Sequence, residues 1–305
     1  MRVVVTGGSG FIGSHVVDAL LAAGDDVLVI DDLSTGRLGN LRDALANGLA
    51  PSRIVRSSVV DPAAAEAVIR FRPHAVVLLA AQMSVGVSMR DPVLDARVNL
   101  LGLLAMLEAA RSAGGPRVVF ASSGGTIYDP AAQPPYREDA PKAPASFYGL
   151  TKWAGVEYLR LYREHRGVDS VALALGNIYG PRQDPAGEAG VVAIFARRLL
   201  RGEPCVVNGD GRQTRDYVYV ADAVDAVLRS LRWGRGLVNI GSGVETSVLQ
   251  VHDALSGLVG RRQPPVFGPA LPGEVRRVCL DPSLAARELG WRPAVPVEEG
   301  ARRVL

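Results

Sequence analysis

Two apolar runs and one amphipathic segment dominate the N-terminal part of the chain. Residues 3–5 and 27–30 are unbroken apolar runs, typical of strands in a parallel sheet that helices cover on both faces. Between them, apolar residues from Val16 to Leu21 recur at helical spacing, and Gly24 follows. This spacing predicts a helix that ends at the glycine. The predicted order is therefore strand, turn, helix, strand.

The same alternation continues toward residue 114. Apolar runs at 54–60 and 74–82 predict two more buried strands, and the segment 62–71 between them predicts a helix. A longer helix is expected at 94–114, where apolar residues occupy nearly all sides. Such a helix lies either deep in one domain or at a dimer interface, and we favour the interface. The whole pattern predicts an α/β fold, a Rossmann-type doubly wound parallel sheet.

Composition narrows the classes of function. The chain is 48% hydrophobic and 21% charged, an ordinary globular balance. Its formal net charge is +3 and its arginines are dispersed, so we expect no nucleic-acid partner. Cys205 and Cys279 lie far apart, which argues against a disulfide scaffold or a metal site. The sequence shows no signal peptide and no apolar stretch near the roughly 20 residues of a membrane span, so we expect no membrane partner and a cytoplasmic location.

Three glycines mark the turn between the first strand and the first helix. Gly7, Gly10 and Gly13 form a G-x-x-G-x-x-G sequence, which lets the backbone approach a pyrophosphate at the N-terminus of a helix. Asp31 ends the next strand, where a carboxylate accepts hydrogen bonds from an adenosine ribose. The same carboxylate would repel a 2′-phosphate. The sequence therefore predicts a dinucleotide site, with NAD favoured over NADP.

A tyrosine and a lysine at helical spacing supply candidate chemistry. Tyr148 and Lys152 are four residues apart, so they share one face of a helix predicted to begin near residue 146. They follow a strand that ends in a small-residue turn, FASSGGTIYD at 120–129. A tyrosine has a pKa of about 10, and a neighbouring ammonium together with a positive nicotinamide ring can lower it. Tyr148 is thus the candidate base, and Lys152 also suits the nicotinamide ribose.

Motifs along the whole chain place these observations in a family. TGGSGFIGSH, DDLSTG, LAAQ, SSGGTIY, YGLTK, NGDGRQTRDYVYVADAVDA, NIGSG and LGWRP occur in this order. Together they resemble the extended short-chain dehydrogenase/reductase superfamily, its NAD-dependent epimerase/dehydratase family, and within it the actinobacterial UDP-galactose (UDP-glucose) 4-epimerases. The resemblance implies NAD-dependent C4 epimerisation of a nucleotide-diphosphate sugar, UDP-glucose or UDP-galactose, through a transient 4-keto intermediate.

The resemblance also implies how the chain is organised. A Rossmann domain would bind NAD with residues 1–176 and about 217–240. A smaller α+β domain, residues 177–216 and 241–305, would bind the sugar nucleotide. We expect a homodimer through the helices around 95–112 and 148–165.

The same resemblance names the site residues. The catalytic residues would be Tyr148, Lys152, Ser123 and Thr126. The residues that bind NAD would be Gly7, Gly10, Phe11, Ile12, Gly13, Asp31, Asp32, Ser34, Thr35, Gly36, Ser58, Val59, Leu79, Ala80, Ala81, Gln82, Asn99, Ala121, Ser122, Tyr148 and Lys152. The residues that bind the sugar nucleotide would be Gln82, Ser84, Ser123, Gly124, Gly125, Thr126, Tyr148, Asn177, Gly190, Val191, Val192, Phe195, Val206, Asn208, Arg215, Tyr217 and Arg276.

The active-site turn departs from the family pattern. Counting back from Tyr148 places Ser123 at the usual catalytic hydroxyl, whereas aligning on Thr126 places Gly124 there. We favour Ser123 as the hydroxyl nearest Tyr148, with Thr126 as a contact to the sugar. Asp129 also replaces a customary glycine in this turn.

Two further departures affect binding. Ser58 stands where an aspartate usually contacts adenine, and Leu271 stands where a second diphosphate-binding arginine is typical. We expect Arg276 or Arg182 to replace that arginine.

The sequence argues against some related reactions and leaves others open. The turn lacks the Asp-Glu pair of the 4,6-dehydratases, which argues against dehydration, and it lacks the acidic partner of a decarboxylase. UDP-glucuronate and UDP-N-acetylhexosamines remain open as substrates. A 4-keto-sugar reductase, which releases its cofactor in each turnover, is an alternative of the same fold. A non-catalytic NAD-sensing module is another, although it usually lacks the tyrosine or the lysine.

Overall fold

A seven-stranded parallel sheet forms the larger part of the computed structural model, which describes residues 1–186, 190–260, 263–270 and 275–305. Its strands, in sheet order, are β10 (Gly236–Ile240), β6 (Ser170–Leu175), β5 (Arg117–Ser123), β4 (Ala75–Leu78), β1 (Arg2–Thr6), β2 (Asp26–Asp31) and β3 (Ile54–Arg56). The order reverses between β1 and β4, which is where doubly wound sheets bind ligands. The predicted Rossmann-type α/β fold is confirmed.

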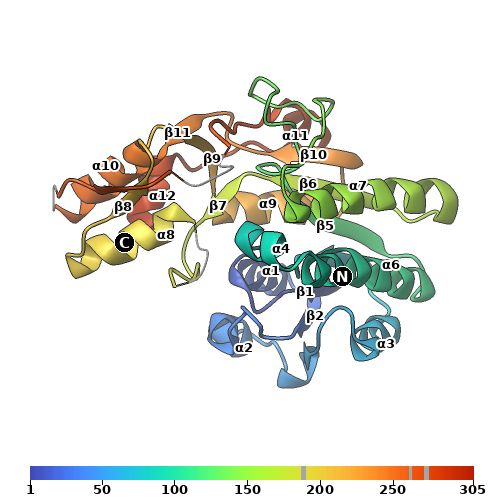
Figure 1. Cartoon of the computed structure of the whole chain (residues 1–305). Coiled ribbons are helices and arrows are strands. Elements are labelled where there is room, and N and C mark those ends of the chain that lie inside the picture. The colour runs from blue at the N-terminus through green and yellow to red at the C-terminus, as the bar shows by residue number, and fades with distance from the viewer. Residues whose placement is uncertain (187–189, 261–262, 271–274) are drawn as a thin grey trace.

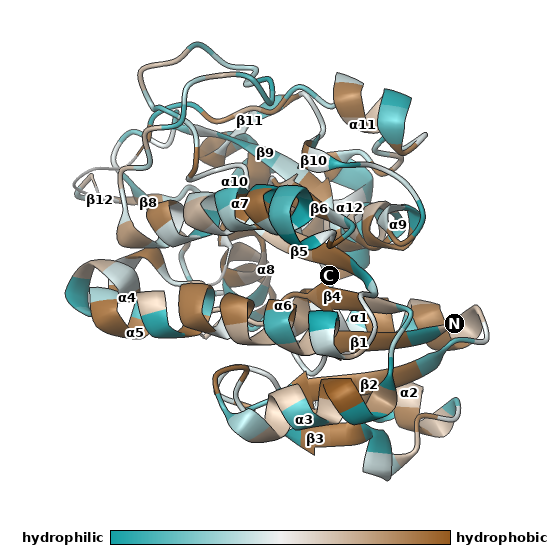
Figure 2. Ribbon diagram, turned by 90° about the vertical axis from the view of Figure 1, so that its right-hand side faces the viewer, coloured by the Kyte–Doolittle hydropathy of each residue, from teal (hydrophilic) through white to brown (hydrophobic). Residues whose placement is uncertain are grey.

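Successive residues of the strands contribute their side chains to two separate hydrophobic cores. In β1, Val3 and Val5 belong to one core and Val4 to the other, because side chains alternate between the faces of a sheet. The first core includes α1 (Phe11–Ala22) and α9 (Val220–Ser230), and the second includes α3 (Pro62–Phe71), α6 (Gly102–Ser112) and α7 (Phe147–Arg166). Figure 2 shows β1 and β2 in brown, as strands buried on both faces should be. Across the described residues, no helix is both long and apolar enough to cross a membrane.

The C-terminal part adds two small sheets and several helices, in yellow to red in Figure 1. A three-stranded sheet contains β11 (Glu245–Ser247), β9 (Thr214–Tyr219) and β7 (Asn177–Tyr179), and β12 (Val266–Gly268) pairs with β8 (Val206–Asn208). The helices of this part are α8 (Val191–Arg201), α10 (Val248–Val259), α11 (Ser283–Glu288) and α12 (Val297–Val304). β10 returns the chain to the large sheet. The division into a cofactor and a substrate domain stays a prediction.

Two elements differ from the sequence prediction. The strand expected at 54–60 ends at Arg56, because the Ser58 amide donates to Asp61 Oδ2 at 3.1 Å and the chain turns into α3. The helix expected at 94–114 consists of α5 (Pro92–Ala96), the π-helical turn η3 (Arg97–Leu101) and α6. Wide helical turns of this kind are frequent at functional sites. The remaining short helices are η1 (Leu38–Leu41), α2 (Arg42–Ala46), η2 (Pro51–Arg53) and α4 (Val85–Arg90).

Candidate active site

The glycine turn between β1 and α1 is closely packed. Gly7 has a φ of +70°, and a Cβ built there would lie 2.8 Å from the Ala80 amide nitrogen. A Cβ on Gly13 would lie 2.1 Å from the Gly7 carbonyl oxygen. Gly10 is the N-cap of α1, before Phe11 and Ile12, and no side chain caps this helix, so the amides of its first turn have no side-chain acceptor at the cap. Only glycines permit this approach of backbone to backbone, which fits the pyrophosphate of a dinucleotide.

Asp31 lies at the end of β2, next to that turn. One carboxylate oxygen accepts from the Ser9 amide at 2.8 Å and the other from the Leu33 amide at 2.8 Å. Burial raises the pKa of Asp31, and these two backbone donors oppose the rise. Each oxygen keeps a further lone pair for a ribose hydroxyl. The predicted loop of Asp32, Ser34, Thr35 and Gly36 follows directly, and Gly36 packs against the carboxylate.

The other predicted cofactor residues follow the ends of neighbouring strands. Ser58 and Val59 follow β3, residues 79–82 follow β4, and Ala121 and Ser122 lie at the end of β5. The side chain of Val59 is buried and packs against Gly102, so it faces the core. The residues present therefore fit NAD through the glycine turn and Asp31. The Val59 side chain packs into the core beneath this site.

Helix α7 brings Tyr148 and Lys152 together at the end of β5. The side chain of Ser146 caps the helix by accepting from the Gly149 amide at 3.1 Å. Lys152 Nζ lies 5.8 Å from the centre of the Tyr148 ring and donates to the Ala121 carbonyl at 3.0 Å. The Ser123 hydroxyl lies near enough to the Tyr148 phenol to lower its pKa. Ser123 is therefore the hydroxyl of the turn that acts on the tyrosine.

Burial controls the proton affinities of this pair. It raises the pKa of Tyr148 to about 12, against the opposing effect of the Ser123 hydrogen bond. It lowers the pKa of Lys152 to about 8, against the opposing charge of Asp95. The sequence led us to expect that the ammonium would help to lower the tyrosine pKa. In the protein alone burial dominates and the Tyr148 pKa stays raised, so the positive charge of a bound nicotinamide would have to contribute to making Tyr148 a base.

The structure explains the glycine that replaces a hydroxyl residue in the turn. A Cβ on Gly124 would lie 2.4 Å from Leu280 Cδ1, and Leu280 is fully buried. The leucine thus fills the space of a side chain at position 124. Gly125 is open toward Asn177 Oδ1, 3.9 Å from a Cβ built there. Thr126 Oγ1 is buried and has no hydrogen-bond partner among the described residues.

The predicted diphosphate residues meet on adjacent strands. Asn177 of β7 pairs with Tyr217 of β9, and Arg215 is two residues away on β9. Arg215 Nη1 donates to the carbonyls of Thr214 and Val275 at 2.8 and 2.9 Å, which holds the guanidinium against the protein. Tyr217 is buried, and its ring meets that of Tyr179 edge to face.

The arginines expected to replace the missing diphosphate contact are engaged elsewhere. Arg276 makes a bidentate ion pair with Asp210, at 2.7 and 2.8 Å. Arg182 donates to Asp18 at 2.6 Å and Asp43 at 2.8 Å, which ties it to α1 and α2. Leu271, the position of the departure itself, lies outside the described residues.

The predicted nucleotide-binding residues of and near α8 differ in exposure. Val192 and Phe195 are 1% and 2% exposed and belong to the first hydrophobic core, because their spacing in α8 places them on its inner face. Their side chains therefore face the core, and their part in nucleotide binding stays a prediction. Gly190, Val191 and Asn208 are partly buried, and Val206 is exposed.

Sequence reasoning missed two residues beside the catalytic pair. Asp95 is fully buried, and Thr151 Oγ1 donates to its Oδ2 at 2.7 Å. The predicted site residues Gln82 and Asn99 donate to the other oxygen at 2.8 and 2.9 Å. Gln82 also bonds to Ser84, whose side chain caps α4. The available signal was a carboxylate, Asp95, near the start of a largely apolar helical stretch.

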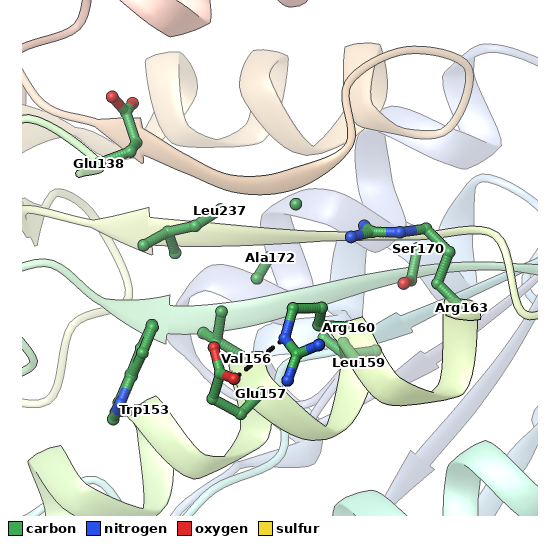
Figure 3. Close-up of a pocket in the computed structure, with 11 residues that line it drawn as sticks. Glu138, Trp153, Val156, Glu157, Leu159, Arg160, Arg163, Ser170, Ala172 and Leu237 are labelled. Carbon is green, nitrogen blue, oxygen red and sulfur yellow. Dashed lines mark hydrogen bonds and ion pairs between the residues drawn. The ribbon is translucent and has the colours of Figure 1, made fainter. Parts of the chain in front are cut away.

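A separate groove lies on another side of α7. Figure 3 shows Trp153, Glu157 and Arg160 of this helix on the side that faces Leu237 of β10. The groove that these residues help to line has a volume of about 140 Å³. An ion pair at 3.0 Å joins Glu157 to Arg160. None of the predicted catalytic residues lines this groove, so it plays no part in the chemistry considered below.

Comparison with known proteins agrees with this geometry. Residues 3–241 match the family model of the NAD dependent epimerase/dehydratase family, and the chain belongs to that family. It is 45% identical to a UDP-glucose 4-epimerase of Mycolicibacterium smegmatis, over 100% of this chain and 97% of that protein.

Two solved structures are also close. A UDP-glucose 4-epimerase of Thermotoga maritima with UDP-glucose has a TM-score of 0.93 and 42% identity, covering 100% of this chain and 97% of that one. A Thermus thermophilus UDP-glucose 4-epimerase in complex with NAD has a TM-score of 0.88 and 43% identity, with the same coverage.

Proposed function

We propose that this protein is an NAD-dependent isomerase that inverts C4 of a nucleotide-diphosphate sugar, with UDP-glucose and UDP-galactose as the substrate pair. The observation that carries the proposal is the group formed by Tyr148, Lys152 and the Ser123 hydroxyl at the end of β5. The glycine turn and Asp31 supply the cofactor site beside it. The names of the relatives agree with this reaction.

Each residue of the group has a distinct task in this mechanism. NAD, held by the glycine turn and Asp31, would supply a reversible hydride acceptor for C4 of the sugar. Tyr148 removes the proton of the 4-hydroxyl and later gives it back. Ser123 donates a hydrogen bond where negative charge develops on the sugar oxygen. Lys152 holds the nicotinamide ribose and adds positive charge near the phenol.

The turn favours an epimerase over related enzymes. Gly124 and Gly125 offer no acid or base for dehydration. A 4-keto-sugar reductase would have to release its cofactor in each turnover, whereas an epimerase regenerates NAD when the hydride returns to the sugar. Gly125 also leaves room next to Asn177, so a substituent at C2 or C6 of the sugar must be tested directly.

The test uses purified protein without added cofactor. We would incubate it in deuterated buffer with UDP-glucose, UDP-glucuronate or UDP-N-acetylglucosamine and follow the anomeric protons by NMR. Of the three substrates, we expect only UDP-glucose to react and to give new signals of UDP-galactose. A Tyr148→Phe variant should give no new signals. Epimerisation of one of the other two sugars would change the substrate. No product at all, with NAD present in the denatured protein, would contradict the proposed reaction.

We further propose that the protein is a homodimer. Exposed apolar side chains gather on elements that pack together, α4, α5, η3 and α7. They are Val85, Met89, Val93, Leu94, Leu101, Phe147, Leu150, Tyr158 and Leu161. We call this set the apolar face. Patches of this kind mark protein interfaces, and a second copy of the same face would cover it by two-fold symmetry. Compared with the helices first expected, the face includes η3 and α7 but not the buried side of α6.

A further inference from the structure

A buried carboxylate beside the catalytic pair has no part in the proposed chemistry. Asp95 in α5 is fully buried. Its Oδ1 accepts from Gln82 Nε2 at 2.8 Å and Asn99 Nδ2 at 2.9 Å, and its Oδ2 accepts from Thr151 Oγ1 at 2.7 Å. These three donors are neutral. A buried carboxylate is costly to desolvate unless its charge is compensated, so packing alone does not account for an aspartate here.

Thr151 links this carboxylate to the catalytic helix. It lies between Tyr148 and Lys152 in the sequence, and its hydroxyl is also 3.0 Å from the Tyr148 carbonyl oxygen. The carboxylate thereby fixes the first turns of α7 against α5. Any shift of α7 would move the phenol and the ammonium together.

The surroundings of Lys152 show which group compensates the charge of its buried ammonium. From β5 it meets the Ala121 carbonyl and the ring of Phe120, both neutral. From its own helix it meets the neutral ring of Tyr148. From α5 the negative charge of Asp95 acts on the ammonium and raises the Lys152 pKa, although the opposite effect of burial is stronger.

We propose that Asp95 is a positioning residue for the Tyr148 and Lys152 pair. It holds α7 in place through Thr151, and its negative charge offsets the cost of burying the Lys152 ammonium. The catalytic consequence rests on the proposed function: the ammonium stays largely charged at neutral pH, as its task at the cofactor requires.

The lysine content of the chain permits a direct test. Lysine occurs only at positions 142 and 152, so protein labelled with ¹³Cε-lysine gives two side-chain signals, which Lys142→Arg assigns. In the wild-type protein we expect Lys152 to titrate near pH 8. In Asp95→Asn the midpoint should fall by about 0.5–1 pH unit, less than the 1–3 units of a contact ion pair because a hydroxyl and amides intervene. Asparagine suits the site because its Oδ1 can still accept from Gln82 and Asn99.

Two controls separate charge from geometry. Lys142 faces Asp139, Glu138 and Glu157 rather than Asp95, so its titration should not change in Asp95→Asn. Thr151→Val keeps the carboxylate but removes the link to α7. We expect it to leave the Lys152 midpoint unchanged and to lower kcat about tenfold with little change in KM.

The outcomes are decisive in both directions. An unchanged Lys152 midpoint in Asp95→Asn overturns the role of the charge, and wild-type kcat in Thr151→Val overturns the positioning role. If Asp95→Asn does not fold, Asp95→Ser removes the charge and leaves room for water beside the donors. The titration does not depend on turnover. A shifted midpoint in a protein that epimerises nothing would therefore support the role of Asp95 and reject the proposed function.

Discussion

At the scale of single residues, the two hydroxyls of the turn have different surroundings. The Ser123 hydroxyl acts on the pKa of the Tyr148 phenol, whereas Thr126 Oγ1 is buried without a partner among the described residues. We predict that Ser123→Ala lowers kcat by about 10²-fold, the cost of a lost donor to a developing oxyanion. Thr126→Ala should mainly raise KM. Steady-state kinetics with UDP-glucose measure both. The reverse order of effects would assign the donor role to Thr126, and NAD retained by both variants would show that the cofactor site is intact.

Lys152 should also leave a signature in the pH dependence of stability. Its pKa is lowered to about 8 in the folded protein, whereas a lysine in the unfolded chain has a pKa of about 10.4. Between these values the unfolded state binds more protons, so the stability contributed by this group rises with pH. We predict that wild type gains more stability than Lys152→Met when the pH is raised from 7 to 10. Urea unfolding of both proteins at both pH values measures the difference, and a difference that is independent of pH would contradict the lowered pKa.

At the scale of elements, the turn after β5 and the segment around Leu280 share one space. Leu280 occupies the position of a side chain at Gly124. We predict that Gly124→Ala lowers the free energy of unfolding by about 1–3 kcal/mol through overpacking, and that Leu280→Ala costs about 2–5 kcal/mol through a cavity. The double variant should cost clearly less than the sum, because the new methyl group partly fills the cavity. Urea unfolding of all four proteins gives the coupling, and strict additivity would show that the two positions are independent.

These elements also show what the sequence could and could not predict. The bounds of β1, α1 and α3 follow from apolar periodicity and from glycine or proline at their ends, which are local signals. The pairing of Tyr148 with Lys152 follows from helical spacing for the same reason. The contact of Leu280 with Gly124 joins segments far apart in the chain, and so does the bond of Thr151 to Asp95. Such contacts depend on tertiary packing and leave no periodic signal. The family resemblance that implied Val192 and Phe195 could not show that helical packing turns both side chains inward.

At the scale of the whole molecule, the apolar face sets the expected assembly. Val93, Leu101 and Leu150 are 75%, 57% and 50% exposed. Val93 and Leu101 lie on α5 and η3, which pack against the catalytic helix α7, and Leu150 lies on α7 itself. Burying such side chains against a second copy gains roughly 25 cal/mol per Å² of apolar area, and a stable interface buries more than about 1,000 Å². Because Leu150 and Tyr148 are on the same helix, assembly would also restrain the catalytic helix.

We therefore predict a particle of about twice the 32.2 kDa of one chain. A double variant, Leu101→Asp with Leu150→Asp, should sediment as a monomer, since two charges at the centre of an apolar interface cannot be desolvated without a partner. Leu38→Asp is the matched control, because Leu38 is as exposed as Leu150 but lies in η1, outside the apolar face. Sedimentation equilibrium should give dimers for wild type and Leu38→Asp only. A dimeric double variant would place the interface elsewhere, and a monomeric wild type would mean that a single chain contains the complete active site.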